Sequence, residues 1–168
     1  RRVEDVRNAR ASCFLGLFES VLAEYQRMLA EEGAIDFSDM IQRAVSLVTD
    51  GAITPDYRYI LVDEFQDISR GRAQLLQAIL HRSPGSKLFA VGDDWQSIYR
   101  FTGSDIDLMV RFPAHFGFTR RTDIETTYRF TDKLLEASSK FVLAYPEQLR
   151  KTLTAPRATE LPAVEVIS

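Results

Sequence analysis

The chain has 168 residues, 45% of them hydrophobic, which is enough to bury the core of one domain or one and a half. Its 21 basic and 24 acidic residues leave a net charge of −3. That balance excludes no class of partner, because a weakly acidic protein can still hold nucleic acid in a local basic groove. The single cysteine, Cys13, excludes an internal disulfide, and we expect its thiol to be buried on an apolar helix face. No run of about 18 apolar residues and no signal-peptide pattern occurs, so the sequence predicts a cytoplasmic protein without a membrane span.

The N-terminal part of the chain is expected to form two helices. Apolar side chains recur at helical spacing from Phe14 to Leu29, and Gly33 is expected to end that helix. Asp36 is placed to cap a second helix, which stops at the segment 49–51. The chain opens within a charged helical segment and without an initiator methionine, which suggests an internal piece of a longer protein.

A strand, a helix and a second strand come next. The apolar run Tyr59–Val62 predicts a strand, Ser69 is placed to cap a helix at 70–80, and the run LFAV at 88–91 predicts a second strand. This order is typical of a βαβ unit, in which the two strands lie parallel. The expected fold class is therefore α/β, with a parallel sheet and flanking helices.

The pattern weakens after the second strand. A short helical turn is expected at 95–101, and Ser104 is placed to cap a helix that Pro113 would end. A boundary between two α/β units is expected near residues 113–120.

The C-terminal part is expected to start a second unit. Moderate alternation predicts a strand at 118–128, and Thr131 is placed to cap a helix at 132–145. The proline-containing stretch at 146–162 is expected to be a loop, and the run at 164–167 a last strand.

Acidic residues follow both strands of the predicted βαβ unit. Asp63 and Glu64 come after the first strand, and Asp93 and Asp94 after the second. Ligands of open parallel sheets bind beyond the carboxyl ends of the strands. A carboxylate there can hold Mg²⁺, and a neighbouring one can orient or deprotonate a water molecule. Such acids can also merely cap helices or solvate the sheet edge, but two clusters at adjacent strand ends favour a site.

Aromatic and basic residues follow the second acid pair. Tyr99 and Phe101 lie beside Trp95 and Arg100, and aromatic rings there could stack on unpaired bases, at roughly 1–3 kcal/mol each. On spacing alone, the favoured interpretation is that these aromatic side chains fill the space between two domains. Arg129, after Tyr128, could neutralise charge on a phosphoryl group, although most surface arginines do not.

Four segments resemble motifs of the superfamily 1A helicases, the UvrD/Rep/PcrA group. ILVDEFQD at 60–67 resembles motif II (Walker B), VGDDWQSIYRFTGSD at 91–105 motif III, and IETTYRF at 124–130 motif IV. IDFSDMI at 35–41 is similar to the helix that precedes motif II. Because order and spacing agree, the chain is identified as a member of this group, most similar to its helicase IV type.

The resemblance implies a P-loop NTPase (RecA-like) fold that is incomplete at both ends. Residues 1–115 would be the C-terminal half of RecA-like domain 1A, with motifs II and III, and residues 116–168 the start of domain 2A, with motif IV. Motifs I, V and VI are absent, including the phosphate-binding GxxxxGK[ST] loop. The isolated chain is therefore expected to be inactive.

The resemblance also implies roles at the nucleotide. Asp63 would hold the Mg²⁺ of bound MgATP, Glu64 would activate the attacking water, and Gln66 would link the nucleotide to the rest of the site. Gln96 would sense the γ-phosphate. In the second domain, Tyr128 would pack on the adenine and Arg129 would be the arginine finger. The implied catalytic residues are thus Glu64, Gln96 and Arg129.

Motif III implies contacts to DNA. Tyr99, Arg100 and Phe101 would bind single-stranded DNA; Phe101 stands where relatives often have Trp, and Thr102 where they often have Arg. The implied protein is an ATP-dependent DNA helicase or translocase in repair or recombination, of 3′→5′ polarity, acting on single strands and duplex junctions. Two alternatives are a metal-dependent nuclease that uses Asp63, Glu64 and the acids at 93–94, and a non-catalytic remnant of the fold.

Overall fold

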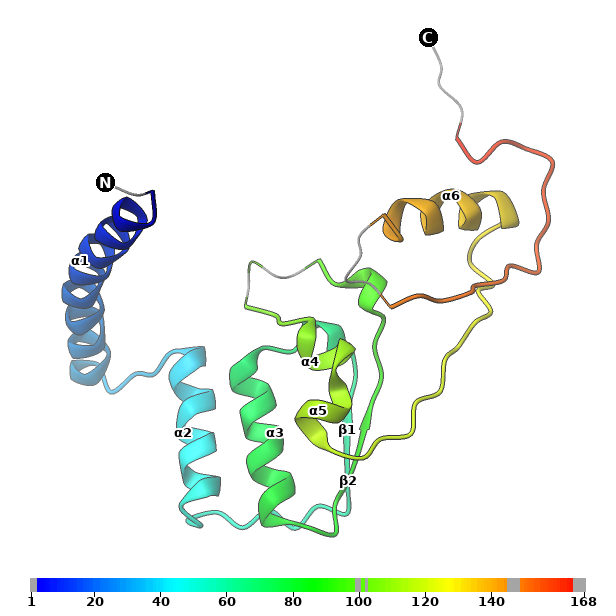
Figure 1. Ribbon diagram of the computed structural model, residues 1–168. Helices are drawn as coiled ribbons and strands as arrows, with labels where there is room; N and C mark the ends of the chain where they lie inside the picture. The colour runs from blue at the N-terminus through cyan, green and yellow to red at the C-terminus, as the bar shows by residue number, and fades with distance from the viewer. Residues whose placement is uncertain (1–2, 99–100, 102, 145–148, 165–168) are drawn as a thin grey trace.

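The computed structural model describes residues 3–98, 101, 103–144 and 149–164 (Figure 1). Its longer helices are α1 (Val3–Glu31), α2 (Phe37–Thr49), α3 (Arg70–Arg82) and α6 (Asp132–Val142). The described residues contain two strands, β1 (Tyr59–Val62) and β2 (Lys87–Ala90). Each is followed by a short 3₁₀ helix, η1 (Phe65–Asp67) after β1 and η2 (Asp94–Gln96) after β2. Two short helices follow, α4 (Asp107–Val110) and α5 (Phe112–Phe116).

The βαβ unit is confirmed. β1 and β2 pair in parallel, with Tyr59 opposite Lys87 and Val62 opposite Ala90. α3 connects them and begins after Ser69, whose hydroxyl accepts a hydrogen bond from the Arg72 N–H at 3.4 Å. β1 has its predicted bounds, and β2 begins and ends one residue earlier than predicted.

α2 covers α3, and the two helices lie side by side (Figure 1). The predicted cap of α2 is confirmed, because the Asp36 carboxylate accepts a hydrogen bond from the Asp39 N–H at 2.7 Å. At the other end of α2, the Arg82 guanidinium donates to the Val48 carbonyl at 3.0 Å. Arg82, the last residue of α3, thus joins the end of α3 to the end of α2.

A small apolar core lies directly beneath the carboxyl ends of the strands. Phe65, Ile68, Ala73 and Leu108 form its buried centre. The Phe65 ring lies 5.1 Å from the Phe112 ring and 5.7 Å from the Phe116 ring, centroid to centroid. These ring contacts pack α5 against η1 and so stabilise the turn that follows β1.

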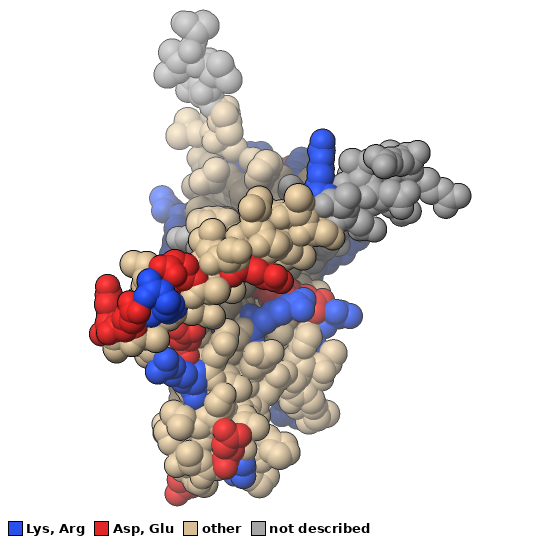
Figure 2. Space-filling view, turned by 90° about the vertical axis from the view of Figure 1, so that its left-hand side faces the viewer, with Lys and Arg blue, Asp and Glu red and all other residues tan. Residues whose placement is uncertain are grey.

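α1 differs from the expectation of a buried stripe. Gly33, with φ at +63°, ends the helical region as predicted, but Figure 1 shows α1 to one side of the sheet. Phe14, Leu17 and Val21 are 65%, 72% and 67% exposed. Cys13 is exposed as well, so the predicted burial of its thiol was wrong, because the stripe faces solvent within the described residues. Figure 2, viewed from the side on which α1 lies, shows uncharged surface interrupted by patches of both charges.

The predicted helix ending at Pro113 was wrong. Ser104 does not cap it: Ile106 occupies the cap position of α4, and Ser104 instead forms a bridge with Ser69. Pro113 lies in the first turn of α5 and so begins a helix. A proline is tolerated there because the first N–H groups of a helix have no intrahelical acceptor.

The predicted strand at 118–128 was also wrong. Within it the structure has one isolated bridge, between Thr126 and Thr154, and the Phe118 and Ile124 side chains are 103% and 81% exposed. Alternating apolar and polar residues form a strand only when a neighbouring strand supplies hydrogen-bond partners, and none lies beside this stretch in the described residues. α6 begins after Thr131 as predicted, although the Thr131 side chain makes no capping hydrogen bond. Residues 165–167 of the predicted last strand lie outside the described residues, and Val164 is not in a strand.

Among the described helices, none is both long and apolar enough to cross a membrane.

Candidate functional site

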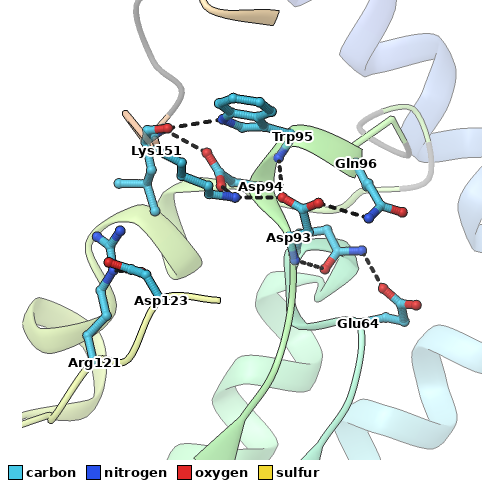
Figure 3. Close-up of polar contacts among 10 residues, drawn as sticks. Glu64, Asp93, Asp94, Trp95, Gln96, Arg121, Asp123 and Lys151 are labelled. Carbon is cyan, nitrogen blue, oxygen red and sulfur yellow. Dashed lines mark hydrogen bonds and ion pairs between the residues drawn. The ribbon is translucent and has the colours of Figure 1, made fainter. Parts of the chain in front are cut away.

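The acid pairs at 63–64 and 93–94 follow the carboxyl ends of neighbouring parallel strands, as predicted. Figure 3 shows Glu64, Asp93 and Asp94 at this edge of the sheet. Backbone pairing continues just past the strands. The Val91 N–H donates to the Val62 carbonyl, and the Phe65 N–H donates to the Val91 carbonyl, each at 2.9 Å. The turn after β1 is therefore attached directly to the chain after β2.

Glu64 has an unusual backbone conformation. Its φ of 48° and ψ of 45° lie in the left-handed region, which costs a non-glycine residue of order 1–3 kcal/mol. The Asp63 carboxylate accepts a hydrogen bond from the Glu64 N–H at 2.9 Å and supports the turn. Strain of this kind persists only where the surroundings fix it, and it clusters at functional sites.

Gln66 connects the two strand ends. Its side chain is only 2% exposed. Its amide Nε2 donates to Glu64 Oε2 at 2.7 Å, and its Oε1 accepts from the Asp93 N–H at 3.0 Å. Gly92 permits this approach, because a Cβ on that residue would lie 2.6 Å from the Gln66 Oε1.

Asp93 organises the chain after β2. Its Oδ2 accepts from the Gln96 amide at 2.8 Å, and its Oδ1 accepts from the Trp95 N–H at 3.2 Å and from the Lys151 ammonium at 2.6 Å. Burial raises the pKa of the Asp93 carboxyl, but the hydrogen bonds from Lys151 and Gln96 outweigh it, so this pKa lies below its ordinary value. The carboxylate form is thus favoured.

Asp94 is fully buried, with 0% of its surface exposed. Its Oδ2 accepts from the Leu149 N–H at 2.7 Å, and its Oδ1 contacts the Lys151 ammonium. The Trp95 indole donates to the Leu149 carbonyl at 3.0 Å. Asp93 and Asp94 therefore bind protein groups, as Figure 3 shows.

Sequence reasoning missed Lys151, which lies in the stretch expected to be a loop. No local motif marks this residue. The available signal was indirect, because two adjacent acids after a buried strand require a cation or several donors. The cation expected beside these acids was a metal ion, and the structure has a lysine there instead.

The other predicted residues lie apart from this network or outside the described residues. Tyr128 is 76% exposed and Arg129 is exposed. In the part of the chain that the structure describes, no hydrogen bond or ion pair joins Arg129 to Glu64. Phe101 is 83% exposed, while Tyr99 and Arg100 lie outside the described residues.

The Asp63 carboxylate could hold a Mg²⁺ ion. It is exposed at the end of β1, and carboxylate oxygens are ligands that Mg²⁺ prefers. The described residues contain no group of three or more His, Cys, Asp or Glu side chains gathered as a metal site. The four acids at the strand ends thus do not form one cluster, and the nuclease hypothesis gains no support from their arrangement.

An open hollow of about 590 Å³ lies beside the network, lined by Glu64, Gln66, Asp67, Trp95, Gln96 and Ile98. One carboxylate oxygen of Asp67, Oδ1, is buried there with no hydrogen-bond partner among the described atoms. The hollow combines amide donors with carboxylate acceptors, which suits a polar ligand.

Comparison with known proteins identifies the family. The UvrD/REP helicase N-terminal domain matches residues 4–117. DNA helicase IV of Escherichia coli (strain K12) is 42% identical over 139 residues, which cover 83% of this chain and 20% of that protein. ATP-dependent DNA helicase PcrA of Bacillus subtilis (strain 168) is 31% identical over 127 residues, which cover 73% of this chain and 17% of that protein.

The chain thus spans about a fifth of the length of these helicases. The family match extends across both strand ends, which include Glu64, Gln66, Asp93 and Gln96. The chain belongs to the UvrD/REP helicase family.

Proposed function

We propose that this chain forms part of an ATP-driven motor that moves along single-stranded DNA. The observation that supports the proposal best is the hydrogen-bonded series Glu64–Gln66–Asp93–Gln96 across the ends of β1 and β2. This series joins Glu64, whose carboxylate is suited to act as a base on water, to the side-chain amide of Gln96, which lines the same hollow. The named relatives, DNA helicase IV and ATP-dependent DNA helicases, favour the same reading.

The residues at the strand ends would each have a separate role at bound MgATP. Asp63 would hold the Mg²⁺, which offsets charge on the phosphates when bound. Glu64 would accept the proton of the attacking water, with its carboxylate oriented by the Gln66 amide. Gln96, held by Asp93, would contact the γ-phosphate.

The remaining residues would act from the second domain and on DNA. In this proposal residues 1–115 belong to RecA-like domain 1A of a P-loop NTPase and residues 116–168 to domain 2A. Tyr128 would pack on the adenine and Arg129 would reach the γ-phosphate, and their exposure leaves both side chains accessible to a ligand. Phe101, also exposed, would stack on a base beside Tyr99 and Arg100.

The proposed motor has 3′→5′ polarity and acts on single strands and duplex junctions in repair or recombination. The 168 residues contain no GxxxxGK[ST] loop, so the isolated chain is expected to show no ATP hydrolysis.

The test is ATP hydrolysis by the full-length protein, with and without single-stranded DNA, compared with its Glu64→Gln variant. Removing a general base should lower DNA-stimulated kcat by about 100-fold or more. Glu136→Gln, the same change on the exposed face of α6, should leave kcat unchanged. Mg²⁺-dependent DNA cleavage without ATP would support the nuclease instead. No turnover at saturating MgATP and DNA would support the remnant.

A further inference from the structure

Lys151 brings a positive charge into a largely dry position. Its side chain is 15% exposed and lies between Asp93 and Asp94, within 2.6 Å of the Asp93 Oδ1 (Figure 3). Two adjacent carboxylates repel each other when they are removed from water, and an ammonium between them offsets that repulsion. The geometry of this acid pair therefore depends on Lys151.

The backbone next to Lys151 is fixed to the same place. The Leu149 N–H donates to Asp94, and the Leu149 carbonyl accepts from the Trp95 indole. The Lys151 ammonium also lies 5.4 Å from the centroid of the Trp95 ring, within range of a cation–π contact. The segment 149–151 is thus attached to η2 through several independent contacts.

The same stretch of chain runs alongside the residues that carry Tyr128 and Arg129. The Thr154 N–H donates to the Glu125 carbonyl at 2.8 Å, and the Thr127 N–H donates to the Thr154 carbonyl at 2.9 Å. Farther along, the Asp132 N–H donates to the Arg157 carbonyl at 2.9 Å. Residues 149–157 therefore connect Asp93 at one end with the backbone on either side of Arg129 at the other.

We propose that Lys151 is a positioning residue that couples the Arg129 segment to Gln96 and Glu64. The proposal rests on the proposed function. Lys151 fixes one oxygen of Asp93, so the other oxygen stays directed at the Gln96 amide. The Asp93 N–H also donates to the Gln66 side chain, whose amide donates to Glu64, so the position of Asp93 constrains Glu64 as well. A displacement of the Arg129 segment thereby alters the orientation of the Gln96 and Glu64 side chains.

The test uses the full-length protein and the ratio of DNA-stimulated to DNA-independent kcat for ATP hydrolysis. Lys151→Met keeps the apolar stem and removes the charge, and we expect the ratio to fall by about fivefold or more, the lower range of measured couplings between sites. Lys151→Arg keeps the charge and should restore at least half of the ratio. Lys140→Met, at an exposed ion pair on α6, is the matched control and should leave the ratio unchanged.

A structural role alone would lower both rates together, or lower the melting temperature, without changing their ratio. Lys151→Gln, which can still donate to Asp93, is the second variant should Lys151→Met fail to fold, and its ratio should also fall. A ratio within twofold of that of the unaltered protein in a folded Met or Gln variant would overturn the proposal, as would loss of the fold in both. Absence of hydrolysis by the unaltered protein would instead refute the proposed function, and this proposal with it.

Discussion

Glu64 and Gly92 show how closely the two strand ends approach. Glu64 accepts a left-handed backbone that suits glycine better, and Gly92 stands where a side chain would collide with its neighbours. Between them lies the buried amide of Gln66. The backbone is thus arranged around one side chain, at the expense of local conformational preference.

Gly92→Ala should therefore destabilise the protein. The added Cβ would lie 2.6 Å from the Gln66 Oε1 and 3.0 Å from the backbone nitrogen of Phe65, and the latter cannot move without the turn. Overpacking of this kind costs about 1–3 kcal/mol of unfolding free energy. Gly85→Ala is the matched control, because no atom lies within 4 Å of its added Cβ. Equal urea midpoints for the two variants would contradict the expected clash.

At the scale of elements, α4 and α5 are joined by a charged cluster. The Asp107 carboxylate accepts from the Arg111 guanidinium at 2.5 Å and 2.8 Å, and it lies 3.0 Å from the His115 ring nitrogen. The Arg111 hydrogen bond, followed by that of His115, lowers the pKa of Asp107 to about 2. The cluster thus connects two helices that flank the core.

Stability should fall in acid because of this carboxylate. Its folded pKa is depressed relative to about 3.9 in an unfolded chain. The ionised Asp107 carboxylate therefore makes its full contribution to the free energy of unfolding above about pH 4, and this contribution is lost as the pH falls towards 2. Asp107→Asn and Arg111→Gln should each flatten the dependence of unfolding free energy on pH in that window. A slope between pH 4 and 2 that is unchanged in Asp107→Asn would exclude Asp107 as its source.

Local signals predicted the elements whose determinants are local. Asp36, Ser69 and the apolar run at 59–62 predicted α2, α3 and β1, because caps and short buried runs depend on neighbouring residues. The strand at 118–128 could not be judged this way, since a strand exists only with a partner. The strand-end acids were predicted from the parallel sheet, but Lys151 was not, because its contact with Asp93 spans 58 residues.

Across the whole molecule, one face of the sheet is uncovered in the described structure. Leu61 and Phe89 lie opposite each other in register and are 74% and 62% exposed, whereas Ile60 points to the partly buried face. Contiguous apolar surface of this kind marks an interaction site or an aggregation liability. The face is a place where further protein can pack.

The 168-residue chain should accordingly associate in solution, and replacing both Leu61 and Phe89 by Thr should reduce the association. Threonine retains a preference for strands, so the sheet should persist. Sedimentation velocity measures the change. Ile60→Thr, on the opposite face, should lower stability without reducing association. Equal association of the double variant and the unaltered chain would show that this face is not responsible.

The contact between Asp93 and Lys151 also has a consequence for synthesis on the ribosome. The two residues are 58 positions apart, so at roughly 5–20 residues per second the ribosome needs about 3–12 s to add the second after the first. During that interval β1, α3 and β2 can already be paired, while the acid pair after β2 lacks its ammonium. The end of the sheet that carries Gln96 is therefore completed late, after the scaffold beneath it.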